Sequence, residues 1–246
     1  INRLKTVQRD DFKVVTIPMF FEIEKARPGY ALRRGLQILV DKCDNAIQQG
    51  ASMLILSDRG VEPGKVPIPS LLATSAVYHG LLDRGLQGEA GLIIESGEPR
   101  EVMHFCLLCG FGGNAINPYM AFESLDELQR QGDLPADIEP SQLADNYIAA
   151  IKKGILKTMS KMGISTLRSY HGAQLFEAIG LNREFVDEYF VGTTSRIGGS
   201  DIDQIAEEAI DRHNAAFGQR SPDALSLDLG GEYHFRNQGE RHLWNP

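Results

Sequence analysis

Short apolar runs alternate with amphipathic segments of helical length along most of this chain. The apolar runs are continuous rather than alternating with polar residues, which is typical of strands covered on both faces in a parallel sheet. The segments between them repeat apolar residues at helical spacing, and several end at glycine, as helices do. This rhythm predicts an α/β fold with a mainly parallel sheet and covering helices.

The expected elements can be placed by residue number. Strands are expected at residues 14–17, 53–56, 91–94 and 115–116, with a fifth at 166–169. Helices are expected at 30–49, 69–84, 99–108, 122–131, 141–162, 173–179, 183–190 and 201–217. Two further short strands, bounded by glycines, are expected at 225–229 and 232–235. Four or five strands in the main sheet are too few for a closed eight-stranded barrel, so we expect an open or half-barrel-like sheet.

The chain shows no internal boundary. Its composition does not shift, and it contains no low-complexity segment and no repeat beyond the strand–helix rhythm, so we expect one domain over residues 1–246. The sequence begins at Ile1 rather than at a methionine, and its last residues, 243–246, form neither a helix end nor a polar tail. We therefore expect both ends to be cuts within a longer polypeptide.

The charge balance argues against two classes of partner. Lys and Arg together number 25 against 33 Asp and Glu, which gives a net charge of −8. An acidic chain without a long basic run is a poor candidate for binding nucleic acid or an anionic membrane surface. No apolar run approaches the roughly 20 residues that span a bilayer.

The 3 cysteines are too few for a disulfide scaffold and indicate a reducing compartment such as the cytoplasm.

Polar residues follow the predicted strands at the point where each strand ends. Because the carboxyl ends of parallel strands share one edge, where open α/β sheets bind ligands, these residues form a candidate ligand edge. The candidates are Ser57, Asp58, Arg59, Glu95, Ser96, Asn117 and, at a predicted strand-to-helix turn, His171. Two interpretations stay open: the groups hold a polar ligand, or they pair with one another and with loop backbone.

Other conspicuous motifs favour structural roles. Cys106 and Cys109 lie on a predicted apolar helix, and no second cysteine pair completes a zinc site, so we expect buried thiols. His79 and His104 are expected to be hydrogen-bonded interior groups. The segment 198–200 precedes a helix with acidic residues in its first turn, so Ser200 is expected to cap that helix rather than help bind phosphate. No dinucleotide fingerprint, P-loop or nucleophile elbow is present, and no catalytic set emerges.

Several blocks of sequence resemble a known family. Residues 55–59, 68–73, 94–102, 114–119, 159–166, 169–174 and 195–199 resemble the central domain of the glutamate synthase large chain. The blocks occur in the family's order and extend over most of the chain. The resemblance implies a cytoplasmic location, or the plastid stroma in a plant or alga.

The resemblance also implies a reaction in the parent enzyme. Glutamate synthases hydrolyse glutamine in an amidotransferase domain, and the ammonia passes through an internal tunnel to an FMN domain. There it adds to 2-oxoglutarate, and the resulting imine is reduced to glutamate. An iron–sulfur cluster delivers electrons from ferredoxin or a nicotinamide-dependent partner. The central domain links the two catalytic domains.

This chain departs from the residues that carry that chemistry. The family's nucleophile is an N-terminal cysteine, but no cysteine precedes Cys43. Cys106 and Cys109 do not match the cluster ligands. We therefore expect no catalytic residue, cofactor or metal in this chain, and a linker and scaffold role beside the amidotransferase and FMN domains. The alternative is a regulatory module that binds a small metabolite at the ligand edge.

Overall fold

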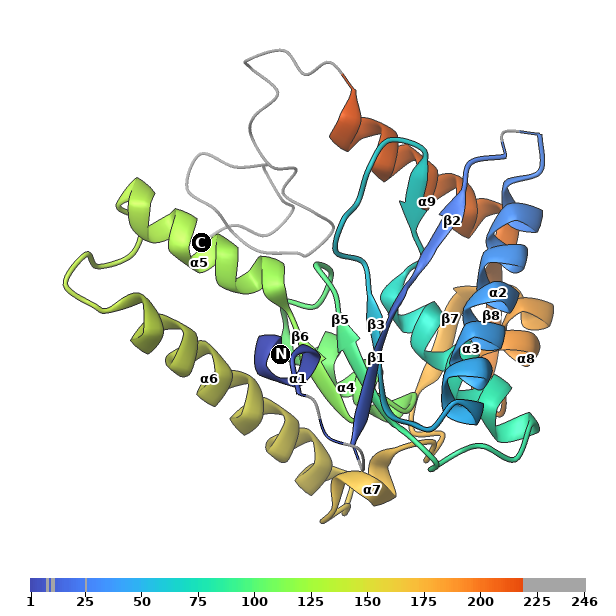
Figure 1. The fold of residues 1–246 in the computed structure, drawn as a ribbon, viewed down its shortest axis with the longest axis horizontal. Helices are drawn as coiled ribbons and strands as arrows, with labels where there is room; N and C mark the ends of the chain where they lie inside the picture. The colour runs from blue at the N-terminus through green and yellow to red at the C-terminus, as the bar shows by residue number, and fades with distance from the viewer. Residues whose placement is uncertain (8, 10–11, 25, 219–246) are drawn as a thin grey trace.

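The computed structural model describes residues 1–7, 9, 12–24 and 26–218 (Figure 1). The strands expected at 225–229 and 232–235 lie outside the described residues. The helices are α1 Asn2–Lys5, α2 Pro28–Gln48, α3 Ser70–Asp83, α4 Val102–Gly110, α5 Tyr119–Gln131, α6 Pro140–Lys161, α7 Leu167–Tyr170, α8 Arg183–Tyr189 and α9 Ile202–Phe217. The strands are β1 Lys13–Pro18, β2 Phe20–Glu22, β3 Ala51–Ser57, β4 Lys65–Pro67, β5 Gly91–Glu95, β6 Ala115–Asn117, β7 Glu177–Leu181 and β8 Thr194–Ser200.

The main sheet has 4 strands in the order β1-β3-β5-β6, and all of them are parallel. Its register places Ser57 beside Glu95 and Glu95 beside Asn117, so three strands end at a common edge. The prediction of an α/β fold with an open, mainly parallel sheet is confirmed, and within the described residues the sheet does not close into a barrel.

Strand order in this sheet follows chain order. Right-handed crossovers that always step in the same direction place α2, α3 and α4 on one face of the sheet. The helices pack side by side there and bury aliphatic side chains that each contribute about 1.5–3 kcal/mol. The main core includes Leu32, Leu36, Leu39, Leu72, Val77 and Leu108 from these helices and Leu54, Leu56, Leu92 and Ile94 from the strands. Because strand order never reverses, the sheet lacks the switch-point crevice in which doubly wound folds bind ligands.

A second cluster lies beyond α4. It contains Cys106, Cys109, Met159 and Tyr170, so α6 packs against α4. Of the apolar residues along α6, Leu143, Ile151 and Met159 are buried, whereas Met162, directly after the helix, is 39% exposed. Figure 1 shows α5 and α6 as an antiparallel pair on the opposite side of the molecule from α2 and α3. No helix in the described part of the chain is long and apolar enough to cross a membrane.

Three expectations about secondary structure and helix capping were wrong. Residues 166–169 do not form a strand; Thr166 instead caps the short helix α7 by accepting a hydrogen bond from the Ser169 amide at 3.3 Å. The helix expected at 173–179 is absent, because this region enters β7, which pairs in parallel with β8. The cap of α9 is Asp201 rather than Ser200, and its carboxylate accepts hydrogen bonds from the next helical amides.

Candidate functional site

A buried carboxylate stands at the carboxyl edge of the sheet. Glu95 ends β5 and is 0% exposed. Its Oε2 accepts hydrogen bonds from Lys5 Nζ at 2.7 Å and Ser57 Oγ at 2.5 Å, and its Oε1 from Arg59 Nε at 3.2 Å and Asn117 Nδ2 at 3.4 Å. Burial raises the pKa of Glu95, but the hydrogen bonds from Lys5 and Ser57 and the nearby cationic charges outweigh it, so the pKa is lowered overall.

A second buried carboxylate lies beside the first. Asp58 is 4% exposed and follows β3. It accepts hydrogen bonds from Ser96 Oγ at 2.6 Å and from the Gly97 amide at 3.1 and 3.2 Å, and Tyr119 also hydrogen-bonds to it. Burial raises the pKa of Asp58, and these hydrogen bonds lower it only in part. The two neighbouring carboxylates are therefore shifted in opposite directions.

Arg59 covers the edge from the solvent side. Its guanidinium lies 3.9 Å from the centre of the Tyr119 ring, a cation–π distance, and 3.5 Å from the Glu123 carboxylate. Together with its contact to Glu95, this places every charged side chain of the edge against a partner from the same chain. A ligand would have to displace these partners to bind here.

The structure brings six of the seven predicted edge residues together. Ser57, Asp58, Arg59, Glu95, Ser96 and Asn117 share the two networks, whereas His171 does not. Gly97 and Tyr119, in the segments that follow β5 and β6, were expected at this edge but not named as site residues, whereas Lys5 was missed. Lys5 is 90 residues from Glu95 in the chain, and no local pattern points to that contact.

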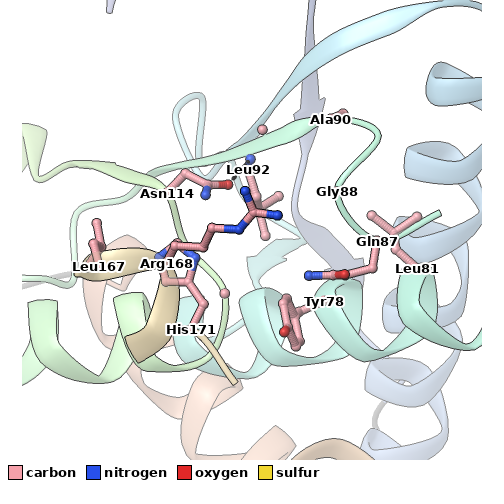
Figure 2. A pocket seen from close by; sticks show the side chains of 12 residues that line it. Tyr78, Leu81, Gln87, Gly88, Ala90, Leu92, Asn114, Leu167, Arg168 and His171 are labelled. Carbon is pink, nitrogen blue, oxygen red and sulfur yellow. Dashed lines mark hydrogen bonds between the residues drawn. The ribbon is translucent and has the colours of Figure 1, made fainter. Parts of the chain in front are cut away.

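His171 lies at the opposite end of the sheet. It lines a pocket of about 480 Å³ beside Gly91, the first residue of β5, together with Tyr78 and Arg168 (Figure 2). His171 is absent from the carboxyl edge because residues 167–170 form helix α7 rather than a fifth strand, so His171 does not follow the end of a strand.

The remaining residues singled out in the sequence have structural roles. All three cysteines are buried free thiols, as expected for Cys106 and Cys109, and burial raises the pKa of Cys109 to about 11. His104 is exposed rather than interior; its Nδ1 accepts hydrogen bonds from the Arg100 and Glu101 amides at the start of α4. His79 is half-buried, and burial lowers its pKa. The described residues contain no group of three or more potential metal ligands.

The fold and the carboxyl edge of the main sheet define the class of protein. It is an open parallel α/β domain whose own side chains occupy the edge at which such sheets bind ligands. Residues 1–182 match the family model of the glutamate synthase central domain, and the chain belongs to this family.

Relatives agree over nearly the whole chain. It is 42% identical over 243 residues to the glutamate synthase [NADPH] large chain of Bacillus subtilis, covering 99% of this chain and 15% of that protein. It is 39% identical to the glutamate synthase [NADH] of Schizosaccharomyces pombe, covering 100% of this chain and 12% of that one. The ferredoxin-dependent glutamate synthase of Pyropia yezoensis is 36% identical, with 99% and 16% covered. The chain thus spans about a seventh of these relatives.

Proposed function

We propose that this chain is the central scaffold of a glutamate synthase and serves L-glutamate biosynthesis by fixing the positions of the parent enzyme's catalytic domains. The observation that carries the proposal is the filled carboxyl edge: Glu95 accepts hydrogen bonds from Lys5, Ser57, Arg59 and Asn117, so groups of this chain already occupy its carboxylate. A sheet edge saturated by its own side chains stiffens a domain rather than holding a reactant.

The dimensions and surface of the domain support this role. The 22 residues of α6 form a rod about 33 Å long, enough to hold two neighbours apart at a set distance. Large apolar side chains remain exposed, among them Leu156 at 66%, Ile179 at 69% and Ile197 at 60%. Contacts with the amidotransferase and FMN domains of the same chain would cover such side chains and help exclude water from the ammonia path.

The test measures coupling in the full-length parent enzyme. Glu95→Gln, which weakens the edge, should lower the glutamate formed per glutamine hydrolysed and release free ammonium, while glutamine hydrolysis itself continues. Glu123→Gln, an exposed substitution on the same edge, is the matched control and should keep the ratio of the natural enzyme. An unchanged ratio in a destabilised Glu95→Gln enzyme would contradict the scaffold role.

A second test addresses the 246-residue chain alone. The scaffold proposal expects neither glutamine hydrolysis nor flavin absorbance from it. The alternative, a metabolite-binding module at the carboxyl edge, requires a ligand whose binding is lost in Arg59→Gln. Screening 2-oxoglutarate, glutamine, glutamate and nucleotides against both forms decides between the two roles.

A further inference from the structure

The pocket that contains His171 differs from the carboxyl edge in charge and in pairing. Leucines from α3, β5 and α7 form part of its wall, and polar side-chain groups from four segments of the chain line the rest. Among the described residues that line it, Arg168 is the one that is permanently charged, and none is acidic. Figure 2 shows the Arg168 side chain extended across the pocket toward Leu92 and Asn114, with Gln87 on the other side.

Some of these polar groups are paired, since Asn114 Oδ1 accepts a hydrogen bond from the Leu92 amide at 2.7 Å, but three side chains have unpaired atoms within the described part of the chain. Arg168 makes no ion pair or hydrogen bond there, and the side chain of Gln87 makes none. The Nε2 atom of His171 is buried without a hydrogen-bond partner. A buried polar atom left unpaired costs about 1–3 kcal/mol, which a ligand that satisfied it would recover. The carboxyl edge, by contrast, satisfies its own groups.

The protein positions the histidine in one tautomer. The backbone carbonyl of Gly113 accepts a hydrogen bond from the ring of His171, which assigns the proton to Nδ1 because Nε2 has no partner. Burial lowers the pKa of His171, and the Gly113 carbonyl opposes this only in part. The ring is therefore neutral at neutral pH, and its unprotonated Nε2 is available as a hydrogen-bond acceptor.

Two glycines hold the wall of the pocket. Gly112 has φ +109°, and a Cβ there would lie 2.2 Å from the Tyr78 ring. Gly172 has φ +65°, and a Cβ there would lie 2.6 Å from the Tyr78 hydroxyl oxygen. Larger residues would push Tyr78 out of place, so the backbone on both sides can approach the ring only because these positions are glycine.

We propose that this pocket binds a small organic anion whose carboxylate or phosphate oxygens accept hydrogen bonds from Arg168 and whose hydroxyl or N–H donates to Nε2 of His171. The guanidinium is a planar fork suited to either oxyanion. Leu81, Leu92 and Leu167 provide an apolar wall for the carbon skeleton. The volume of about 480 Å³ is within the range of small-molecule sites. The inference is independent of the scaffold role, since it concerns the opposite end of the sheet.

Isothermal titration calorimetry of the 246-residue chain tests the proposal. The probes are L-malate and L-glutamate, which are carboxylates with a hydroxyl or amine donor, and 3-phosphoglycerate, which distinguishes a phosphate preference. Succinate and glutarate are the matched analogues without the donor. We expect at least one probe to bind and its analogue to bind about tenfold more weakly.

Variants assign the binding to the pocket. Arg168→Gln should weaken binding by about tenfold or more, and Arg168→Lys should restore part of it, because the charge remains but the fork is lost. Arg212→Gln is the control: this arginine is exposed on α9 and makes no ion pair within the described residues. The proposal fails if no probe binds at about 10 mM. It also fails if Arg168→Gln binds like the natural chain or if Arg212→Gln weakens binding equally.

Discussion

Replacing Glu95 with glutamine tests whether the filled edge stabilises the fold. The carboxylate accepts hydrogen bonds from four side chains, the shortest from Ser57 at 2.5 Å and Lys5 at 2.7 Å. Glutamine keeps the shape but has one acceptor oxygen, and its amide group faces donors with which it cannot bond. Both charged donors are partly exposed, Lys5 at 29% and Arg59 at 46%, so water compensates part of the loss.

The expected cost follows from these contacts. Loss of hydrogen bonds to a charged group costs about 1.5–3 kcal/mol, below the roughly 3–5 kcal/mol for breaking a wholly buried ion pair. We therefore expect Glu95→Gln to lower the free energy of unfolding by about 2 kcal/mol in urea titration, and Tm by about 4–8 °C for a chain of this size. The control Glu123→Gln, at a 3.5 Å exposed contact, should cost about 0–1 kcal/mol.

The loss of unfolding free energy caused by Glu95→Gln should also depend on pH, and should be larger at neutral than at acidic pH. The pKa of Glu95 is lowered in the folded state, so the ionised form stabilises the fold. That contribution is complete above the unfolded-state pKa of about 4.3 and is lost as the pH falls through the folded-state pKa. The difference between the natural chain and Glu95→Gln should therefore shrink below about pH 4. A difference that is no larger than in Glu123→Gln, or that is constant between pH 3 and pH 7, would refute the reasoning.

Three further predictions rest on separate features. Burial raises the folded-state pKa of Asp58, so the ionised form destabilises the fold and the natural chain loses stability as the pH rises from about 3.9. The free energy of unfolding that Asp58→Asn costs in urea titration should therefore be larger at pH 3 than at pH 7. Gly112→Ala should cost about 2–4 kcal/mol because its Cβ would meet Tyr78, whereas Gly88→Ala, at φ +92° with nothing within 4 Å, should cost about 1 kcal/mol; equal costs in thermal unfolding would contradict the role of Tyr78. Burial raises the pKa of Cys109 to about 11, so mass spectrometry should find it labelled by iodoacetamide far more slowly in the folded chain than in urea, and similar rates would show that the thiol is accessible.

The sheet could be predicted from the sequence because each of its strands, and each helix between them, has a recognisable local sequence pattern. Short continuous apolar runs such as 53–56 are typical of strands covered on both faces. Glycines such as Gly50 and Gly85, both at positive φ, end the helices between them. The shared carboxyl edge then followed from the handedness of the crossovers. Six edge residues were placed correctly for that reason, although whether they hold a ligand was left open.

The elements that escaped prediction depend on distant partners. Residues 173–179 contain good helix formers, but 177–181 pair with Thr194–Ser200 instead, and tertiary pairing overrides local preference. The antiparallel pair β2–β4 has 3 residues in each strand, too few to show a period. The pocket around His171 was missed because it, too, depends on residues far apart in the sequence. It joins segments near positions 78, 90, 112 and 168 that no sequence spacing connects.

Because strand order in the main sheet follows chain order, the domain can assemble as it is synthesised. When β3 leaves the ribosome its neighbour β1 is already available, and β5 and β6 each add to the strand made before them. No strand has to be inserted between two that are already paired, so each crossover helix can settle on the growing sheet in turn. Such stepwise growth limits how long apolar strand edges stay open to aggregation during synthesis.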